Sequence, residues 1–457
     1  MASLPNNPAR DDLVAYIAES KLEYATIGFV DYQGAVRGKY VARNKLEAAL
    51  DRMSFPLSAL ALDPTGDTLF APGIADPNSG FADEPAKLLP ETARLIPWER
   101  EGRNLLVLVE FAGEAAKYCP RNVYHRVYQR AQALSCIPCH SVELEFTLFD
   151  ETPKSAVEKA YRNLNVATPH RAYLSLVRQG AQADFYNELM DMCAGMRIPV
   201  ESLHAERGAG LMEAALRHGH TVEVADNAVL FKTFAKVLAQ RRRMLMTFMA
   251  RWSNEADGQS GHIHFSLTDS CRNPVFYDGK MPDGISGTMC HFIGGLQRLM
   301  GDFLLMFAPN VNSYKRLVPG FFAPTSADWG IENRTCSIRA IPGPPEATRV
   351  ECRTPGADAN PYLSIAAVLA AGLYGIEHAI EPSAPSDNNV YAAEVPEELR
   401  LPADFATAIK CFRQSPHARD YFGDTFVEAY ADTRAAQLAQ FNTFVTDREL
   451  GRFFELV

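Results

Sequence analysis

Apolar and polar residues alternate along several short stretches of this chain, a spacing typical of β-strands that bury one face. Near the start, alternation over residues 25–31 and 35–41 flanks a turn at Gly34 and predicts a β-hairpin. Residues 12–20 have the spacing of an amphipathic helix, and residues 104–111 predict a further strand. Together these elements indicate a small mixed module at the start of the chain.

Longer segments with helical spacing dominate the rest of the chain. Helices are expected over residues 121–134, 183–194, 227–249, 290–306, 361–378 and 405–457, with short strands between the earlier ones. The stretch 113–120 separates the two patterns, so we expect two domains, 1–112 and 113–457.

Composition places the protein among ordinary globular chains. It has 457 residues, of which 47% are hydrophobic and 22% charged, and this excludes a disordered or fibrous protein. The formal net charge of −10 argues against a nucleic-acid-binding protein, which needs a basic surface. The first residues lack an export or transit pattern, and the longest apolar run, 363–376, is too short to span a bilayer. We therefore expect a soluble cytoplasmic protein that binds neither nucleic acid nor membranes.

Four strand-like segments carry ionisable or polar residues two positions apart. A period of two puts such residues on one face of a strand and the apolar residues on the other. The residues concerned are Glu143, Glu145, His262, His264, Ser266, Arg339, Arg349, Glu351 and Arg353. One such face alone is most simply a solvated face. Several of them in one sheet would form a concave surface rich in carboxylates, imidazoles and guanidinium groups.

Such a surface suits divalent cations and phosphate groups. Clustered carboxylates repel one another unless cations neutralise them, and oxygen-rich sites with an occasional imidazole suit Mg²⁺ or Mn²⁺. Arginines bind phosphate or carboxylate groups in a bidentate manner. Because the chain has no GxxxxGK[ST] loop, these residues indicate phosphoryl transfer on a different architecture.

A further stretch, residues 201–213, offers more oxygen ligands. It contains Glu201, Glu206 and Glu213 and turns through two glycines, which could bring Glu213 back beside Glu206. His204 shares a strand face with Glu206, and it is either another ligand or a satisfied buried histidine.

An ordered series of motifs makes the chain resemble the glutamine synthetase family, class I-like. The motifs are VELEFTLFD (142–150), ESLHAERGAGLME (201–213), DGQSGHIHFSL (257–267), PNVNSYKRLVPG (309–320), ENRTCSIRAIP (332–342) and RVECRTPGADANPYL (349–363). The resemblance covers nearly the whole chain and is strongest after residue 120. It implies an α+β fold, with a small N-terminal β-grasp domain and a large catalytic domain of the glutamine synthetase/guanido kinase type built on a curved antiparallel sheet. It also implies a homododecamer of two stacked hexameric rings, in which neighbouring subunits share each site.

The resemblance implies a role for individual residues as well. Two metal ions would be held by Glu145, Glu206 and Glu213 and by Glu143, His262 and Glu351. The residues that match glutamate contacts are Gly258, Arg316 and Arg353. The phosphate positions match Arg334, Arg339 and Arg349, of which Arg334 is also expected to be catalytic, and the nucleotide contacts match Glu201, His264 and Ser266.

The family joins glutamate to ammonia by using ATP and two or three divalent ions, Mg²⁺ or Mn²⁺, and departures from its pattern suggest another amine here. Ammonia-using members carry a Tyr-Glu pair after RLVPG, whereas this chain has Phe321 and Phe322, which we place in an amine pocket. The alternative is that Phe322 only packs a loop. Asp63 is the best counterpart of the ammonium-binding aspartate and is our candidate base.

We therefore expect an ATP-dependent ligase that forms a γ-glutamyl amide from L-glutamate and a small organic monoamine, alkyl or aryl, through γ-glutamyl phosphate. The RGK and LPET segments are similar to those of the subfamily that uses organic amines. A polyamine fits less well, because burying its distal ammonium unpaired against Phe321 or Phe322 would cost roughly several kcal/mol. The alternatives are a glutamine synthetase that uses ammonia, a γ-glutamylpolyamine synthetase and a non-catalytic homologue.

Overall fold

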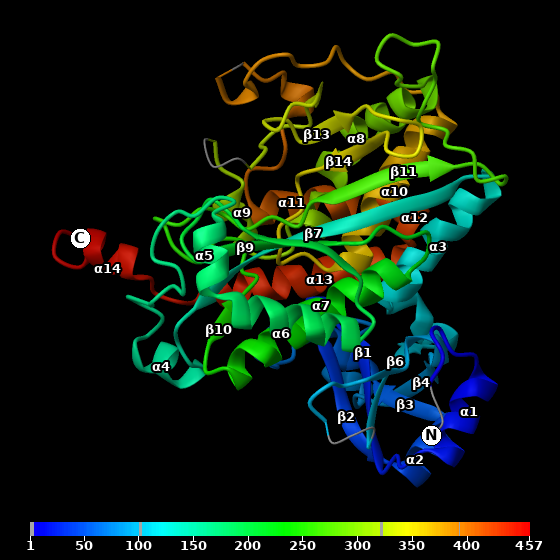
Figure 1. Ribbon diagram of the computed structural model, residues 1–457. Helices are drawn as coiled ribbons and strands as arrows, with labels where there is room; N and C mark the ends of the chain where they lie inside the picture. Colours follow the sequence, from blue (N-terminus) through cyan, green and yellow to red (C-terminus); the bar gives the residue numbers. More distant parts are fainter. Residues whose placement is uncertain (1–3, 100–102, 320–322, 393) are drawn as a thin grey trace.

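The computed structural model describes residues 4–99, 103–319, 323–392 and 394–457. Two β-sheets form the framework, a smaller one in the N-terminal part and a larger one in the C-terminal part, with helices packed around them (Figure 1). In Figure 1 the N-terminal part forms the blue lobe at the bottom right. The α+β fold class predicted from the sequence is confirmed.

Six strands build the N-terminal sheet in the order β2-β1-β6-β4-β3, with β5 paired to β6. They are β1 (Tyr24–Val30), β2 (Val36–Ala42), β3 (Met53–Pro56), β4 (Asp83–Leu88), β5 (Arg94–Leu95) and β6 (Asn104–Phe111), accompanied by α1 (Arg10–Glu19) and α2 (Arg43–Ala49). The predicted hairpin is confirmed, because β1 and β2 pair antiparallel. Strands β1 and β6 run parallel, and the other pairs of this sheet are antiparallel.

The turn between β1 and β2 is held by Asp31. Its carboxylate accepts hydrogen bonds from the N–H groups of Gln33 and Ala35, at 2.9 Å each, while Gly34 adopts a φ of +75°. Arg37 on β2 donates from Nε to the same carboxylate at 2.7 Å and from Nη2 to the carbonyl of Asp63 at 2.7 Å. The hairpin thereby positions the loop that carries Asp63.

Eight strands build the second sheet in the order β12-β13-β14-β11-β7-β9-β8, with β10 paired to β7. They are β7 (Ile137–Phe149), β8 (Val200–Ala205), β9 (Leu211–Leu216), β10 (Leu245–Thr247), β11 (Ile263–Thr268), β12 (Trp329–Ile331), β13 (Ile338–Ile341) and β14 (Arg349–Cys352). Only β12 and β13 pair in parallel among these described strands. The long strand β7 contacts β11 and β9 on its two edges and therefore spans the middle of the sheet.

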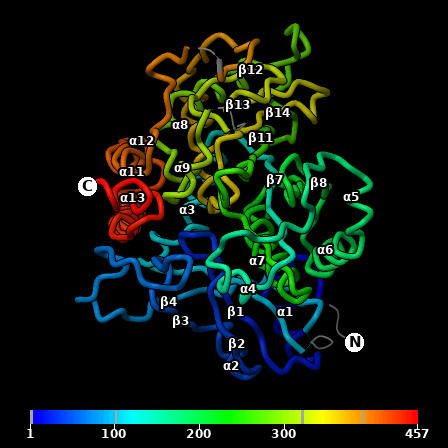
Figure 2. Tube along the Cα trace, turned by 90° about the vertical axis from the view of Figure 1, so that its left-hand side faces the viewer, coloured from blue at the N-terminus to red at the C-terminus, as the bar shows by residue number. Residues whose placement is uncertain are grey.

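Helices flank this sheet and fill the C-terminal part. They are α3 (Pro120–Ala133), α4 (Pro153–Glu158), α5 (Leu176–Ala181), α6 (Ala183–Gly195), α7 (Glu223–Arg241), α8 (Gly287–Phe307), α9 (Ser313–Arg316), α10 (Pro361–Glu377), α11 (Phe405–Gln414), α12 (Pro416–Phe422), α13 (Asp424–Phe441) and α14 (Asp447–Phe453). Figure 2 shows α11 to α13 on the side of the molecule opposite α5 and β8. In the described ranges, no helix combines the length and the apolar character that crossing a membrane requires.

The helix predicted over residues 227–249 is wrong in its second half. Helix α7 ends at Arg241, Arg243 adopts a left-handed φ of 59°, and Leu245–Thr247 forms strand β10 against β7. Met246 and Phe248 are buried, so the period of two in this segment belongs to a strand. The continuous helix expected over 405–457 is likewise divided into α11 to α14, with Gly423 at a φ of +84° between two of them.

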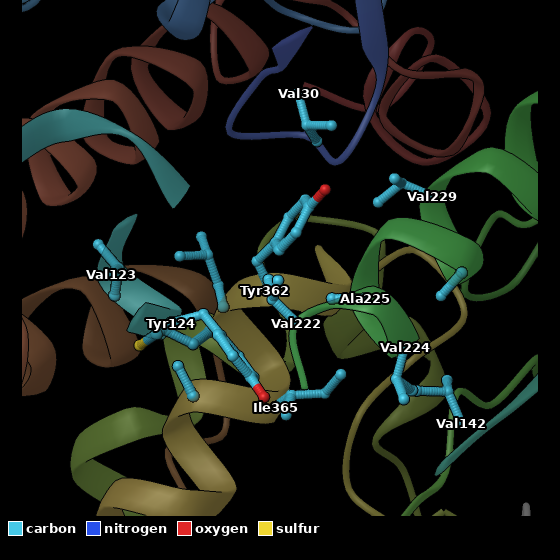
Figure 3. Close-up of a cluster of buried hydrophobic side chains, with 14 of the residues drawn as sticks. Val30, Val123, Tyr124, Val142, Val222, Val224, Ala225, Val229, Tyr362 and Ile365 are labelled. Atoms are coloured by element: carbon cyan, nitrogen blue, oxygen red, sulfur yellow. The ribbon is translucent and has the colours of Figure 1, made fainter. Parts of the chain in front are cut away.

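The two parts of the chain share one hydrophobic core. Figure 3 shows buried side chains from both, with Val30 at the end of β1 close to Tyr362 of α10 and to residues of α3 and α7. The hydroxyl of Tyr362 donates to Asp226 at 2.6 Å, and Arg121 donates to the same carboxylate at 3.1 Å. The N-terminal sheet is therefore packed firmly onto the helices that support the larger sheet.

Candidate active site

The candidate site begins on β7, where burial alternates from one residue to the next. Val142, Leu144 and Phe146 are buried in the core. Glu143 and Glu145 lie on the opposite face of the strand, as the alternation predicted.

Strand register brings further acidic and imidazole residues beside β7. Glu145 lies directly opposite Glu213 of β9, and Glu213 in turn lies opposite His204 of β8. On the other side, His264 of β11 lies opposite Glu351 of β14. Residues far apart in the sequence therefore meet on one face of the sheet.

Glu143 lies at the centre of one group of these side chains. Its Oε1 is 2.9 Å from Nε2 of His264, and its Oε2 is 3.3 Å from Nδ1 of His262. The same Nδ1 is 3.4 Å from Oε1 of Glu351. Glu143, His262 and Glu351, the predicted ligands of one metal ion, thus lie within contact of one another.

A second group surrounds Glu213. Nε2 of His204 is 3.1 Å from Oε1 of Glu206 and 3.7 Å from Oε1 of Glu213. Ser260 fixes the nearby Glu145 by donating to its Oε2 from both the backbone N–H and the hydroxyl. All three carboxylates predicted for the other metal ion line the same cavity.

The carboxylates raise one another's pKa values. Burial and the charges of four neighbouring glutamates raise the pKa of Glu213 to about 9. Burial also raises the pKa of Glu145 to about 7, although the hydrogen bonds from Ser260 oppose the shift. Burial works against ionisation of Glu351 as well, but the charges of His262 and Arg353 outweigh it and lower its pKa to about 2. Without a cation, Glu213 therefore keeps its proton at neutral pH, and a bound cation would favour the ionised form of both Glu145 and Glu213.

These residues fit divalent cations. Three overlapping groups of possible ligand atoms lie within 4.8 Å of one another, namely Glu143, His264 and Glu351; Glu143, Glu213 and His262; and His204, Glu206 and Glu213. Nε2 of His262 is buried and has no hydrogen-bond partner in the described part of the chain. Mostly carboxylate oxygens with a few imidazole nitrogens are the donors expected for Mg²⁺ or Mn²⁺.

Arg316 and Arg353 lie side by side next to this cluster. Arg316 donates from Nη1 to the carbonyl of Thr354 at 2.9 Å and from Nη2 to the carbonyl of Arg353 at 3.1 Å. Nε of Arg353 is buried without a partner among the described residues. Gly258 packs on Arg316 so closely that a Cβ atom there would lie 2.7 Å from its Cγ. An unpartnered guanidinium donor in this position suits the carboxylate of a ligand.

The remaining predicted arginines border the cluster on the β13–β14 side. Arg339 donates to Oε2 of Glu351 at 3.0 Å, and Nε of Arg349 donates to Nδ1 of His264 at 3.2 Å. Arg334 lines the same cavity. The arginines therefore meet the carboxylate cluster from one side.

Most of the predicted residues line one cavity of about 880 Å³, and two lie in a smaller hollow beside it. That hollow, of about 360 Å³, contains Glu201 and Ser266 and shares Glu143, His264 and Arg349 with the cavity. The predicted nucleotide contacts thus lie next to the predicted metal ligands.

Comparison with known protein families identifies the family of this chain. The family described as "Glutamine synthetase, catalytic domain" matches residues 117–453 of the chain. The chain belongs to the glutamine synthetase family. The family prediction made from the sequence motifs is confirmed.

Relatives of this glutamine synthetase homologue are named for reactions with different amines. A type-1 glutamine synthetase 2 of Dictyostelium discoideum is 34% identical over 98% of this chain and 87% of its own length. A gamma-glutamylethanolamide synthetase, GlnA4, of Streptomyces coelicolor is 33% identical over 97% of this chain and 95% of its own. A glutamate–isopropylamine ligase of a Pseudomonas species is 32% identical over 97% of both. Among solved structures, a GmaS–ADP complex superposes with a TM-score of 0.83 at 25% identity and covers both chains completely.

The amine-side residues predicted from the sequence are not found in the cavity lining that the structure describes. Asp63 belongs to the N-terminal part, where its Oδ1 accepts hydrogen bonds from Thr65, Gly66 and Asp67. Burial opposes ionisation of Asp63, but these hydrogen bonds outweigh it and lower its pKa. Phe321 and Phe322 lie outside the described residues.

The cavity also contains residues that the sequence motifs did not single out. Tyr173 and Leu174 border it with Leu211, although the two former side chains are more than half exposed. Arg207 and Ser260 line it too. Ser260 stands within the DGQSGHIHFSL motif, so its position carried a signal, whereas no pattern marks Tyr173 or Leu174.

Proposed function

We propose that this glutamine synthetase homologue is an ATP-dependent ligase that joins the γ-carboxylate of L-glutamate to an organic monoamine. The observation that carries the proposal is the meeting of a carboxylate–imidazole cluster with a row of arginines in one cavity. Such a site neutralises the charge that accumulates when a phosphoryl group moves between oxygen atoms. The membership of the family and the names of the relatives support the same reaction.

The reaction has two steps that conserve atoms and charge. First, the γ-carboxylate oxygen of glutamate attacks the γ-phosphorus of ATP, and the bond to the β-phosphate oxygen breaks to release ADP. Then the amine nitrogen attacks the carbonyl carbon of γ-glutamyl phosphate, phosphate leaves, and a proton is lost as the amide forms. Mixed anhydrides of this kind hydrolyse in water, so the site must also exclude water between the steps.

In this proposal the arginines position the reacting groups. Arg316 and Arg353 hold the glutamate, because Arg353 has a buried N–H group without a partner among the described residues. Arg334, Arg339 and Arg349 lie around the phosphates, and Glu201, His264 and Ser266 contact the nucleotide. Arg334 stabilises the charge of the transferring phosphoryl group.

Glu145, Glu206 and Glu213 would hold one divalent ion, and Glu143, His262 and Glu351 another. When bound, Mg²⁺ or Mn²⁺ ions, two or three in each site, neutralise phosphate charge as Lewis acids. His204 is a further candidate ligand, because its Nε2 lies 3.1 Å from Glu206.

The apolar border of the cavity favours an organic amine over ammonia. Tyr173, Leu174 and Leu211 offer an aromatic ring and aliphatic side chains, against which an alkyl or aryl group makes hydrophobic contacts that ammonia cannot make. Phe321 and Phe322 add to this pocket in our proposal. The nearby carboxylate of Asp257 already has a cation, Arg171 at 3.8 Å, so it is a poor partner for the second ammonium of a diamine.

Asp63 acts in the proposal as the base that takes the proton of the amine. Because it lies away from the cavity of its own chain, it would serve the site of a neighbouring subunit. This arrangement requires an oligomer in which neighbouring subunits share each site, and the homododecamer of two hexameric rings that the family resemblance implies is such an oligomer. Arg37, which binds the carbonyl of Asp63, would hold the loop in place.

An amine panel tests the proposed reaction. Phosphate release is measured with saturating ATP, glutamate and Mg²⁺ or Mn²⁺ and with ammonia, isopropylamine, ethanolamine, aniline or putrescine, and the amide is identified by mass spectrometry. We expect a monoamine to exceed both ammonia and putrescine in kcat/KM by at least about tenfold, or about 1.4 kcal/mol. A higher kcat/KM for ammonia would identify a glutamine synthetase, and no phosphate release with any amine would identify a non-catalytic homologue.

Mixed oligomers test the sharing of the site. Asp63→Asn and Glu351→Gln variants are each expected to be inactive, because each removes one part of every site. Dissociating and reassembling them together should restore about a quarter of the activity, if subunits mix at random and each site combines two neighbours. Recovery of no activity, with mixed oligomers verified by mass spectrometry, would show that Asp63 serves the site of its own chain, and activity of Asp63→Asn alone would show that it serves no site.

A further inference from the structure

A second cavity, separate from the candidate active site, lies between the N-terminal part and the larger part. It has a volume of about 830 Å³. Its walls come from the residues before α1, from β5, from the end of α6, and from the segments around β8, β9 and the start of α7. Four arginines line it, Arg94, Arg197, Arg217 and Arg272, against two glutamates, Glu91 and Glu223.

Arg94 is a buried cation with no carboxylate in salt-bridge contact among the described residues, although the charges of Asp226 and Glu223 act on it from farther away. Its side chain is about 3% exposed, and its Nη1 donates only to the carbonyls of Met196 and Arg197, at 3.2 and 3.5 Å. Burial lowers the pKa of Arg94, as expected for a guanidinium removed from water. A buried charge of this kind is stabilised by an anion.

The neighbouring groups strengthen the positive character of the cavity. Arg197 donates to the carbonyls of Pro5 and Ala93, and only the more distant charge of Glu223 offsets its own, because no ion pair joins these two side chains among the described residues. Arg217 and Arg272 are exposed at the border. Of the two glutamates, Glu91 already lies 3.4 Å from Arg121.

Asn227 adds a hydrogen-bond acceptor to this basic cavity. It lies on the first turns of α7, is about 4% exposed, and its Oδ1 has no partner among the described residues. An acceptor that is buried and unpaired requires a donor, such as a hydroxyl group. An anion that also carries a hydroxyl group would satisfy Arg94 and Asn227 together.

This cavity adjoins the predicted nucleotide hollow. His218 lines both, and the β9 residues that precede it form the wall between them. The first part of β7 lies beside this wall, because His140 and Gly219 exchange two backbone hydrogen bonds of 2.9 Å. A ligand in the second cavity would therefore lie behind the strand that borders the nucleotide.

We infer that the second cavity binds a small organic dianion that carries a hydroxyl group, at a site distinct from those for ATP, glutamate and the amine. The shared chemistry fits both a hydroxylated dicarboxylate and a hydroxylated phosphate ester. The inference does not depend on which amine the enzyme uses.

Calorimetric titration of the whole protein tests this inference. L-malate probes the dicarboxylate source and glycerol 3-phosphate the phosphate source, at constant ionic strength and with saturating ADP, Mg²⁺ and glutamate to fill the active site. We expect one of them to bind with one site per chain. In the Arg217→Gln/Arg272→Gln variant the affinity should fall at least tenfold, whereas the control Arg298→Gln, on exposed α8 surface, should bind as the parent does.

A matched ligand tests the role of Asn227. Succinate has the two carboxylates of malate but no hydroxyl group, so we expect it to bind severalfold more weakly. Equal binding of malate and succinate would overturn the role of Asn227. Absence of binding by both malate and glycerol 3-phosphate, or equal affinity in the double arginine variant, would overturn the site itself.

Discussion

Two neighbouring glutamates on one strand have opposite electrostatic surroundings in this protein. Glu143 is partly buried, but the hydrogen bonds of His262 and His264 outweigh the effect of burial and lower its pKa. For Glu145 and Glu213, burial and neighbouring carboxylates raise the pKa values. The same β-strand alternation produced both positions, so their difference comes entirely from the strands that lie beside them.

Replacing Glu213 with Gln is expected to separate stability from cation binding. At neutral pH the fold keeps Glu213 protonated although the same group is ionised in the unfolded chain, and glutamine avoids this cost, so the protein in EDTA should melt at a higher temperature than the parent. The rise in melting temperature on adding Mn²⁺ should shrink, because the affinity for the ion falls by about tenfold or more. Thermal unfolding with and without Mn²⁺ measures both effects. The exposed Glu398→Gln serves as the control, and an unchanged response of Glu213→Gln to Mn²⁺ would contradict the assignment.

Gly258 tests the placement of Arg316. An added Cβ would lie 2.7 Å from Cγ of Arg316, so Gly258→Ala should displace that side chain. We expect the KM for glutamate to rise at least about tenfold while the KM for ATP changes little. Gly287→Ala is the matched control, because no atom lies within 4 Å of the added Cβ. A similar rise of both KM values would indicate general disruption instead.

At the level of elements, close helix packing supports the sheet that carries the site. Helices α8 and α10 approach each other at two glycines, where a Cβ on Gly375 would lie 1.9 Å from the carbonyl oxygen of His291. A Cβ on Gly295 would similarly meet the carbonyl oxygen of Ala371 at 2.1 Å. Only glycine permits this approach of the two backbones.

Replacing a glycine with alanine should have opposite effects on stability at the close contact between α8 and α10 and at a position with open space. Gly375→Ala forces α8 and α10 apart and should destabilise the protein by about 1–3 kcal/mol. Gly301→Ala, in α8, meets its nearest atom only at 3.7 Å and should stabilise the helix by about 0.5–1 kcal/mol. Urea unfolding followed by circular dichroism compares the two variants. Equal midpoints would show that the helices can separate without cost.

At the level of the whole molecule, a buried lysine of α7 is influenced by charges from both parts of the chain. Lys232 of α7 is buried, and its ammonium donates to the carbonyl of Ala359 at 3.0 Å. Burial, with a contribution from the charge of Lys236, lowers the pKa of Lys232 to about 7, while Asp358 and Asp31 oppose this shift. This lysine therefore titrates in the folded protein near neutral pH.

The shift of Lys232 predicts how stability depends on pH. Between about pH 7 and pH 10.5 the unfolded chain still holds the proton that the folded chain has lost, so this residue makes stability increase with pH in that window. Below about pH 7 Lys232 is charged in the folded protein, so the full cost of burying its ammonium lowers the free energy of unfolding. Lys232→Met should remove this slope, which is at most about 1.36 kcal/mol of unfolding free energy per pH unit. Urea midpoints from pH 6 to pH 10 measure it, with exposed Lys410→Met as the control; an unchanged slope in Lys232→Met would contradict the prediction.

The sequence supported the local predictions well, and its failures have a physical cause. The hairpin around Gly34 and the strand over residues 104–111 were confirmed, because each depends on a pattern within a few residues. Strand β10 was mistaken for helix, because its hydrophobic pattern is short and the neighbouring strand β7 decides its conformation. The roles of Asp63, Phe321 and Phe322 stay predictions.

The sequence by itself determined the family, the alternation of Glu143 and Glu145 and the types of ligand available, because motifs and a period of two are properties of the chain alone. Only the tertiary structure decided that Glu145 faces Glu213 and that His262 lies between Glu143 and Glu351. It also created the basic cavity behind β9, whose arginines come from separate segments without a shared motif. Such contacts depend on strand register and on the packing of distant elements, which local sequence patterns do not encode.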